Sequence, residues 1–343
     1  MTWPRIAVVG ATGAVGSVMI ECLHERGLWN DDVRLFATQR SAGRALDGHV
    51  VEALDDGADL SGIDIALFSA GGGTSRQWAP RFVESGATVI DNSSAFRREP
   101  DVPLVVSEVN PHALRGIGPT PPKLIANPNC STMQLMVALA PIHRAAGIER
   151  LVVATYQSVS GTGQRAVEEL EAQARADIAG EAIPPPRVYR DQIAFNVIGA
   201  AGSFAEGEDH TDEERKMQFE TRKILEDDAI GVAVTCVRVP VRICHCEAVN
   251  VQTREPLSAG RARDLLQDAP GVILEDVPSP LRAAGRDEVF VGRLRADPTH
   301  PRALSMFVVA DNLRKGAATN AVQIAELLIR DGLVASRRQQ AAA

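Results

Sequence analysis

Apolar and polar positions alternate along the first third of the chain as short β-rich runs separated by segments with helical periodicity. The apolar runs predict strands at Arg5–Val9, Val33–Ala37, Ile63–Phe68, Thr88–Asp91, Leu104–Val106 and Lys123–Ala126. Ser75–Glu84 has the pattern of a helix, and Gly86 supplies its end. Strands that alternate with helices in this way are typical of a Rossmann-type, doubly wound and mostly parallel sheet.

Beyond residue 130 the pattern changes, so we expect a second domain of the α+β type. An apolar helix at Met133–His143 is followed by a strand at Leu151–Gln157 and a charged helix at Arg165–Ile178. Two later runs, Gly231–Val239 and Val241–Gln252, are long enough to be antiparallel strands.

A length of 343 residues also favours two domains. The first covers residues 1–129 and is completed by a C-terminal helix at 312–334, in which Ile324, Leu327 and Leu328 share one side. The second covers residues 130–311, and we expect residues 335–343 to be a flexible tail.

Composition and charge exclude several classes of protein. Only 4% of the residues are aromatic although 45% are hydrophobic, which favours an α/β enzyme over a β-sandwich. The net charge of -8 argues against a nucleic-acid surface. No apolar stretch reaches the roughly 18 residues of a membrane helix. The few cysteines make no disulfide framework and no signal peptide precedes the first strand, so we expect a cytoplasmic protein.

The first strand is followed directly by the run Gly10-Ala11-Thr12-Gly13-Ala14-Val15-Gly16, which opens a helix. A pyrophosphate cradle requires this placement, because glycines let the backbone approach the anion and the helix N-terminus faces it. Thr12 replaces the second glycine of the usual fingerprint, so an ordinary tight turn is the alternative interpretation.

The end of the second predicted strand indicates which dinucleotide binds. An NAD site usually has a carboxylate about 20 residues after the glycine motif, where it binds the ribose 2′-hydroxyl. This chain has Arg40 and Ser41 there and no carboxylate. A 2′-phosphate would find a charge partner and a hydroxyl donor, so the sequence predicts NADP. The alternative is that Arg40 is only a solvated loop residue.

Cys130 is the candidate nucleophile. Pro128 keeps the residue before it out of helical geometry, and Ser131 and Thr132 are of the types that satisfy the free amides of a first helical turn. We therefore expect Cys130 at a helix N-terminus, where the macrodipole favours thiolate over thiol. This run alone is equally compatible with a buried structural cysteine.

Several polar runs, together with Cys130 and the glycine motif, resemble aspartate-semialdehyde dehydrogenases. These runs are Asp91–Arg97, Asp101–Val106, Asn129–Thr132, Tyr156–Gly163, Glu213–Lys216, Arg238–His245 and Asp311–Ala318. The resemblance covers nearly the whole chain, and its most specific parts are Asn129–Thr132 and Gln157–Gly161. It makes a functional Cys130 the expected interpretation.

The resemblance implies that β-aspartyl phosphate is reduced with NADPH to aspartate semialdehyde and phosphate, in the biosynthesis of lysine, methionine and threonine. Cys130 would form an acyl thioester that accepts a hydride. Backbone amides near Asn129 and Cys130 would hold the oxyanion. The resemblance also implies a homodimer, in which the first domain binds the dinucleotide and the second carries catalysis and dimerisation.

The resemblance also assigns roles to individual side chains. His245 is the acid/base, and Gln157 orients the acyl carbonyl. The substrate phosphate is assigned to Arg97 and Lys216, the α-carboxylate to Arg238 and the α-ammonium to Glu213. The cofactor side is assigned to Gly10, Thr12, Gly13, Ala14, Val15, Gly16, Arg40, Ser41, Ser160, Gly161 and Asn312.

Arg238 and His245 are seven positions apart, so one regular strand would place them on opposite faces. We expect Pro240 to interrupt the ladder between them, so that both side chains reach one cleft. Cys244 and Cys246 would then point away from His245, and we predict no metal site.

Two rival functions remain open. N-acetyl-γ-glutamyl-phosphate reductase would share the fold and the cysteine chemistry, but Glu213 and Arg238 favour the aspartyl substrate. A noncatalytic NADPH-binding paralogue, acting as a sensor or scaffold, would need none of the four residues whose joint presence favours an enzyme: Cys130, Gln157, Arg238 and His245.

Overall fold

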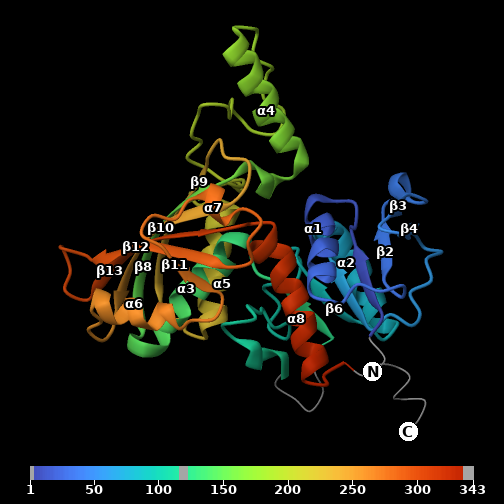
Figure 1. The fold of residues 1–343 in the computed structure, drawn as a ribbon, viewed down its shortest axis with the longest axis horizontal. Coiled ribbons are helices and arrows are strands. Elements are labelled where there is room, and N and C mark those ends of the chain that lie inside the picture. Colours follow the sequence, from blue (N-terminus) through green and yellow to red (C-terminus); the bar gives the residue numbers. More distant parts are fainter. Residues whose placement is uncertain (1–3, 116–122, 335–343) are drawn as a thin grey trace. The chain divides into compact units, whose positions relative to one another are not determined.

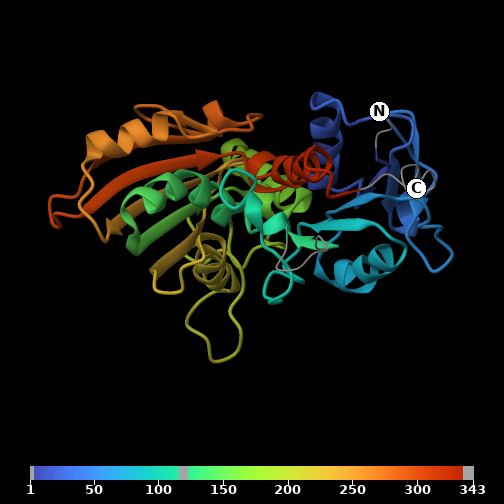
Figure 2. The same ribbon diagram turned by 90° about the horizontal axis from the view of Figure 1, so that it is seen from below.

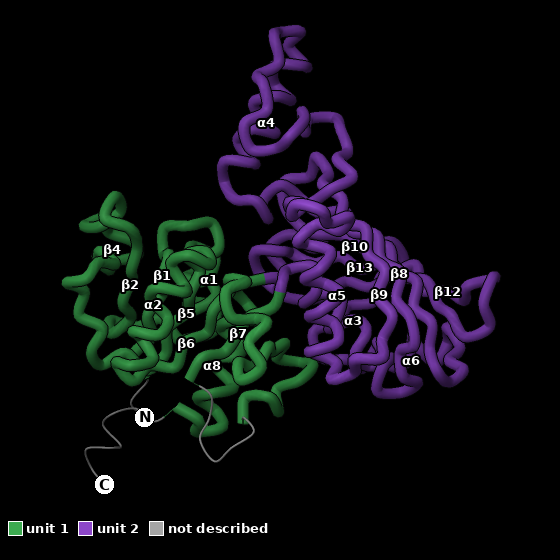
Figure 3. Tube along the Cα trace, turned by 180° about the vertical axis from the view of Figure 1, so that it is seen from behind, with its two compact units in different colours: residues 1–128, 317–343 green, residues 129–316 purple. Residues whose placement is uncertain are grey.

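The computed structural model describes residues 4–115 and 123–334, so the predicted tail at 335–343 lies outside the described residues. The chain divides into two compact units (Figure 3): unit 1 is residues 1–128 with 317–343, and unit 2 is residues 129–316. Within the described ranges no helix is long and apolar enough to cross a membrane.

Unit 1 is built on a seven-stranded sheet. Its strands are β1 (Ile6–Val9), β2 (Arg34–Ala37), β3 (Ala45–Leu46), β4 (His49–Ala53), β5 (Ile65–Phe68), β6 (Thr88–Asp91) and β7 (Leu124–Ala126). The order is β3-β4-β2-β1-β5-β6-β7, and every neighbouring pair is parallel except the β3–β4 hairpin. Without β3 this is the strand order of a Rossmann-type doubly wound sheet, as predicted.

Helices cover both faces of this sheet. Helix α1 (Ala14–Glu25) and the C-terminal helix α8 (Thr319–Arg330) lie side by side on one face (Figures 1 and 2), and α2 (Gly72–Glu84) covers the other. Strand alternation sends neighbouring residues to different layers: Ile6 packs with α1 and α8, whereas Ala7 packs with α2. The last helix of the chain thus belongs to the core of unit 1.

Two details of the predicted strands in unit 1 are wrong. Leu104–Val106 is not a strand, because only Leu104 pairs, in an isolated bridge with Ala126. The chain then turns, and the Asn110 side chain accepts a backbone N–H of this segment at 2.9 Å. The β3–β4 hairpin was not predicted because its alternation is weak: Val51 is the one buried residue of β4.

Unit 2 is built on a mixed six-stranded sheet. Its strands are β8 (Ile148–Gln157), β9 (Gly231–Arg238), β10 (His245–Thr253), β11 (Val272–Leu274), β12 (Val289–Ala296) and β13 (Ala303–Ala310). The order is β11-β12-β13-β10-β8-β9, with β8–β9 and β11–β12 parallel and the other pairs antiparallel. The predicted α+β class of the second domain is confirmed.

A long apolar helix packs on one face of this sheet. Helix α3 (Cys130–Ala146) contacts β10 and β13, with α5 (Asp212–Leu225) and α6 (Ala259–Gln267) beside it. The charged helix α4 (Gln164–Ala179) projects away from the sheet of its unit (Figure 1). The remaining short helices are η1 (Gln39–Ser41), η2 (Pro111–Arg115), η3 (Val159–Thr162), α7 (Pro280–Ala283) and the π-helical turn η4 (Arg314–Ala318).

The strands around Pro240 differ from the prediction. β9 ends at Arg238 and β10 begins at His245, so residues 239–244 are a connection, and no strand starts at Val241. The backbone of Cys244 has a φ of 75°, a left-handed conformation that a strand does not contain. Moreover, β9 and β10 are not neighbours, because β8 lies between them.

Glu247 on β10 is fully buried, and the neutral Gln134 side chain on α3 offsets the effect of that burial on its carboxyl group only in part. Burial raises the pKa of Glu247 well above its ordinary value, so the folded protein holds the carboxyl proton. The unfolded chain releases that proton above about pH 4.3. Glu247 therefore makes the free energy of unfolding fall as the pH rises above this value.

We predict that Glu247→Gln removes this loss, because the amide is neutral at every pH. The variant should gain stability over the parent as the pH rises, by up to about 1.4 kcal/mol per pH unit. Urea unfolding of both proteins at several pH values between about 5 and 8 measures the difference. A difference that does not change with pH would contradict an uncharged Glu247.

Candidate active site

Three polar side chains lie in one row across the sheet of unit 2. Arg238 at the end of β9 is in register with Gln157 at the end of β8, which is in register with His245 at the start of β10. Residues directly opposite one another project from the same face, so all three lie on the face that α3 covers. All three are buried, with exposed fractions of 6%, 1% and 0%. The prediction of one strand that Pro240 interrupts is therefore wrong, because Arg238 and His245 lie on different strands. Their side chains nevertheless lie on one face of the sheet, as expected.

Cys130 is the first residue of α3. The helix is capped by Asn129, whose Oδ1 accepts the backbone N–H of Ser131 at 3.0 Å and that of Thr132 at 3.2 Å. The prediction that Ser131 and Thr132 are the capping side chains is wrong. Asn129 is the cap because its extended backbone directly precedes the first helical residue.

The Asn129 backbone is not available to an oxyanion. Its N–H donates to Oε2 of buried Glu220 at 2.7 Å, since α5 packs against α3. The backbone amides of Asn129 and Cys130 were the two expected oxyanion donors. Of these, the Asn129 amide is already engaged in a hydrogen bond within the protein.

Glu213 connects the surroundings of Cys130 to the row on the sheet. Its Oε1 accepts Nδ2 of Asn129 at 2.8 Å and Nε2 of Gln157 at 3.0 Å, and its Oε2 accepts Nζ of Lys216 at 3.2 Å. Burial acts to raise the pKa of Glu213, but the Lys216 charge and the two amide donors hold that pKa below its ordinary value. Glu213 is therefore an ionised carboxylate that fixes both Asn129 and Gln157.

Lys216 bridges two carboxylates of α5, because it also donates to Oδ2 of Asp212 at 2.5 Å. Burial acts to lower the pKa of Lys216, but Glu213 and Asp212 outweigh it, so the net shift is upward. Asp212, Glu213 and Lys216 all lie in the first turns of α5. The capping box between Thr211 and Glu214 was the sequence signal for that helix.

Arg238 is a buried cation. Its Nη1 donates to the backbone oxygen of Ser158 at 2.6 Å, and its guanidinium lies 5.8 Å from the ring centre of Tyr189. Its Nε has no hydrogen-bond partner within the described ranges. Because a buried guanidinium N–H without a partner is costly, this arrangement fits an anionic ligand.

His245 lies next to a polar cluster around Asn312. The Oδ1 of Asn312 accepts Oγ–H of Ser158 and of Ser160, each at 3.1 Å, and the backbone N–H of Cys244 at 2.9 Å. Ser158 also donates its backbone N–H to Nδ1 of His245 at 3.0 Å. Two residues assigned to the cofactor side, Ser160 and Asn312, are thus held beside His245.

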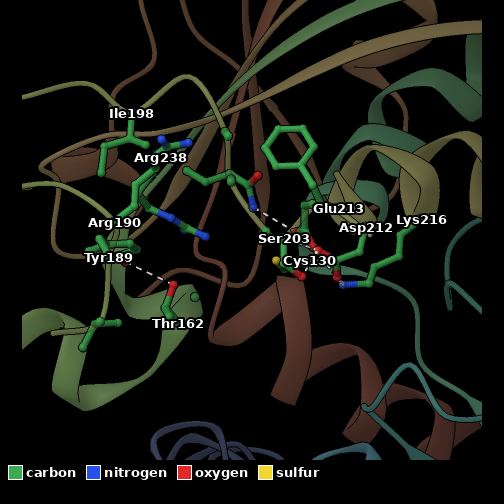
Figure 4. Close-up of a pocket in the computed structure, with 17 residues that line it drawn as sticks. Cys130, Thr162, Tyr189, Arg190, Ile198, Ser203, Asp212, Glu213, Lys216 and Arg238 are labelled. Carbon is green, nitrogen blue, oxygen red and sulfur yellow. Dashed lines mark hydrogen bonds and ion pairs between the residues drawn. The ribbon is translucent and has the colours of Figure 1, made fainter. Parts of the chain in front are cut away.

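A pocket of about 410 Å³ joins Cys130, Glu213, Lys216 and Arg238 (Figure 4), whereas the predicted residues His245, Ser160 and Asn312 are not among the residues that line it. Cys130, Glu213 and Lys216 lie together in it, and Arg238 lies beside Tyr189 and Arg190 on the other side of this view. The remaining predicted residues that border the pocket are Gln157 and Gly161.

The pocket also includes residues that the sequence did not indicate. Tyr189 and Arg190 come from the segment after α4, and Tyr189 is held by a 3.1 Å hydrogen bond from its hydroxyl to Thr162. No motif marks this segment, so only the folded chain identifies it.

The two cysteines beside His245 do not border the pocket. Cys244 and Cys246 are buried in an apolar cluster with Phe290 and Val309. Among the described residues there is no group of three or more His, Cys, Asp or Glu side chains that could hold a metal ion.

The glycine motif lies in unit 1, between β1 and α1. Gly10 has a φ of 90°, and a Cβ there would lie 2.5 Å from the Ser69 backbone oxygen; a Cβ at Gly16 would lie 2.1 Å from the Gly10 oxygen. Gly13 caps α1, of which Ala14 and Val15 are the first residues. A backbone turn with no room for side chains, leading into a helix N-terminus, fits a dinucleotide pyrophosphate.

The other predicted residues of unit 1 lie on η1 and in the loop after β6. Thr12 donates its hydroxyl to Ser41 at 3.2 Å, which ties the glycine turn to η1. Arg40, also on η1, is exposed. Arg97 is buried after β6 and donates to the backbone oxygen of Asn92 at 2.7 Å.

Two family models match the chain: the NAD binding domain of semialdehyde dehydrogenases over residues 5–117 and their dimerisation domain over residues 139–315. The aspartate-semialdehyde dehydrogenase of Aquifex aeolicus is 50% identical over 340 residues, which are 96% of this chain and 99% of the relative.

Two solved structures are also similar. The aspartate semialdehyde dehydrogenase II of Vibrio cholerae complexed with ASA has a TM-score of 0.92 at 47% identity, over 96% of this chain and 99% of that one. The Candida albicans enzyme with NADP has a TM-score of 0.74 at 25% identity, over 97% and 100%.

This chain belongs to the aspartate-semialdehyde dehydrogenase family. The resemblance drawn from the sequence is confirmed, as is the class of enzyme, an oxidoreductase. The relatives favour this family over N-acetyl-γ-glutamyl-phosphate reductases. The NAD binding domain model also supports a nicotinamide dinucleotide as the cofactor.

We predict that iodoacetamide modifies Cys130 before the other cysteines of this aspartate-semialdehyde dehydrogenase family member. Cys130 is partly exposed and the other four are buried. Burial raises the pKa of Cys246 to about 12 and raises the pKa values of Cys236 and Cys244 as well.

Peptide mass spectrometry after labelling at a series of pH values measures the reaction. Alkylation of Cys130 should begin well below the ordinary thiol pKa of about 8.5 because of the helix N-terminus. Buried Cys22 is the internal control. Equal labelling of Cys22 and Cys130 at every pH would contradict activation of Cys130.

Proposed function

We propose that this chain catalyses the NADPH-dependent reductive dephosphorylation of β-aspartyl phosphate to aspartate semialdehyde, through an acyl thioester on Cys130. The observation that carries the proposal is the pocket of unit 2, where Cys130 begins α3 beside an ionised Glu213, a fixed Gln157 and a buried Arg238. The ASA complex of the Vibrio cholerae relative supports the same substrate class.

Each step of the reaction requires one of these groups. The Cys130 thiolate, favoured by the helix N-terminus, attacks the acyl carbon and displaces phosphate. Gln157, held by Glu213, orients the acyl group. A bound nicotinamide supplies the hydride that reduces the thioester. The carbon–sulfur bond then breaks, and Cys130 leaves as thiolate.

Substrate recognition is proposed to rest on charge. Arg238 binds the α-carboxylate, since its guanidinium is buried and its Nε has no partner in the described part of the chain. Glu213 lies within the same pocket and carries the negative charge that an α-ammonium group requires. Lys216 and Arg97 bind phosphate, and Lys216 has to share its charge with Asp212 when it does so.

The two units are proposed to divide the work. Unit 1 binds the dinucleotide, and unit 2 carries catalysis and pairs with a second copy in a homodimer. The dimerisation domain model over residues 139–315 supports this pairing, as does the sheet face opposite α3, where Tyr156 is 39% exposed and Val152 36%. The five free cysteines fit a reducing compartment such as the cytoplasm.

The proposed activity is tested in the reverse direction, with aspartate semialdehyde, inorganic phosphate and NADP, by following NADPH formation. We expect phosphate-dependent turnover that Cys130→Ser abolishes, because an alkoxide is not available at neutral pH. Arg238→Lys should raise KM for aspartate semialdehyde at least about tenfold, because a point charge replaces a bidentate donor. Turnover of N-acetyl-glutamate semialdehyde and not of aspartate semialdehyde would overturn the proposed substrate.

NADP is proposed as the preferred cofactor because Arg40 and Ser41 stand where an NAD site has a carboxylate. We predict that Arg40→Asp shifts the preference from NADP toward NAD by about 100-fold or more in the ratio of kcat/KM values, since a repulsive charge replaces an attractive one. Arg44→Asp, a change at an exposed position of the same segment, is the matched control. Equal preferences in the two variants would contradict a specific role of Arg40.

A further inference from the structure

Tyr189 lies against the buried guanidinium of Arg238. The Cζ atom of Arg238 is over the aromatic ring, 5.8 Å from its centre, which is within the range of a cation–π contact. Both residues border the pocket that contains Cys130, and they lie on the same side of it (Figure 4). The ring therefore contacts the group to which the proposed function assigns the α-carboxylate.

The ring restrains the Arg238 guanidinium without using its hydrogen-bond donors, because an aromatic ring attracts a cation through its π face. Of these donors, Nη1 donates to the backbone oxygen of Ser158 at 2.6 Å, and Nε has no partner within the described ranges. A carboxylate that binds a guanidinium in the bidentate mode lies in the plane of its N–H groups. The contacts with Ser158 and Tyr189 together set the orientation of that plane.

Tyr189 is itself fixed from two sides. Its hydroxyl donates to Oγ1 of Thr162 at 3.1 Å, and its ring packs against an apolar cluster that includes Val159, Leu170 and Ile198. Burial raises the pKa of Tyr189, so the phenol is a neutral donor at physiological pH. The ring is therefore held in place before any substrate binds.

The backbone that carries Tyr189 is held by α4. Oε2 of Glu169 on this helix accepts the N–H of Arg187 at 2.6 Å and that of Val188 at 2.7 Å. Oε1 of Glu169 accepts the N–H of Tyr189 at 3.3 Å. About one turn further along α4, Oε1 of the buried Gln173 accepts two more backbone N–H groups of the same segment. The helix thus fixes this segment beside the pocket.

We propose that Tyr189 is a positioning residue for substrate binding: its ring holds the Arg238 guanidinium in the orientation that binds the α-carboxylate, and Glu169 holds Tyr189 in place. The proposal rests on the proposed function of the pocket. Tyr189 acts through Arg238 and takes no part in thioester formation or hydride transfer. The projecting helix α4 thereby contributes to the site, although no motif of the sequence marks it.

Two substitutions at Tyr189 separate the ring from its hydroxyl. Tyr189→Leu removes the ring, and we expect the KM for aspartate semialdehyde to rise about threefold to 30-fold, the range of a cation–π contact. Tyr189→Phe keeps the ring, so this KM should stay within about twofold of the parent value. In both variants kcat and the KM for phosphate should change by less than about twofold. An unchanged KM for aspartate semialdehyde in the Leu variant, or a loss of kcat as large as the rise in KM, would overturn the proposal.

A double-mutant cycle tests the contact itself without turnover. The melting temperatures of Tyr189→Leu, Arg238→Gln and the double variant are compared with that of the parent. We expect the double variant to lose less than the sum of the two single losses, because either change alone already removes the contact. Additive losses would overturn the proposal. Coupled losses in a protein that does not turn over aspartate semialdehyde would instead reject the proposed function and leave the contact standing.

The role of α4 is tested at Glu169. Glu169→Gln leaves one acceptor oxygen where the carboxylate has two, so we expect the KM for aspartate semialdehyde to rise while kcat is kept. Glu168→Gln, the same change at the exposed neighbouring position of α4, is the matched control and should leave both values unchanged. Equal KM values in the two variants would contradict the part of the proposal that assigns the placement of Tyr189 to Glu169.

Discussion

Backbone hydrogen bonds between β8 and its two neighbours set Arg238, Gln157 and His245 in one row, and the rest of the pocket is arranged around that row. A shift of one residue in either pairing would turn every side chain of the shifted strand to the opposite face. The row faces α3, so the sheet and the first residue of α3 contribute to one pocket. The chemistry of unit 2 therefore depends on strand register, which the apolar residues of β8 and β10 under α3 enforce.

Burial has opposite consequences for two carboxyl groups near this row. Glu213 and Glu247 are both buried, but Glu213 has the Lys216 ammonium and two amide donors within hydrogen-bond distance and stays ionised. Glu247 has no cation beside it in the part of the chain that the structure describes, and the Gln134 side chain offsets burial only in part, so burial raises the pKa of Glu247 well above its ordinary value. The partners, and not the depth, decide where negative charge remains. Of these two glutamates, only the ionised Glu213 borders the pocket.

The sequence alone predicted what depends on local pattern. The continuous apolar runs of a buried parallel sheet marked β1, β2, β5, β6 and β7, and Pro128 marked the start of α3. Prediction from the sequence failed where backbone conformation or the pairing of distant strands decides the structure. Cys244 has a positive φ, so β10 begins only after it, and β8 lies between β9 and β10 although these two follow one another in sequence. For the site, the resemblance supplied the residue types, but the contacts of Tyr189 arise from a segment without any motif. Hydrogen-bond partners across elements leave no periodic signal, so they could not be read from the chain.

The sequence assigns both activation of the Cys130 sulfur and stabilisation of the oxyanion to the first turn of α3, but the structure separates these two tasks. Its dipole favours the Cys130 thiolate, but its neighbouring amides are already engaged: Asn129 donates to Glu220, and two later amides donate to the Asn129 side chain. Part of the stabilisation of an oxyanion in this pocket therefore has to come from another element of unit 2. At the start of β10, burial and then the Arg238 charge lower the pKa of His245 to about 3, so His245 adds no positive charge beside Arg238 at neutral pH. Under the proposed function, activation of the sulfur at the helix and binding of the substrate at Gln157 and Arg238 on the sheet depend on different residues.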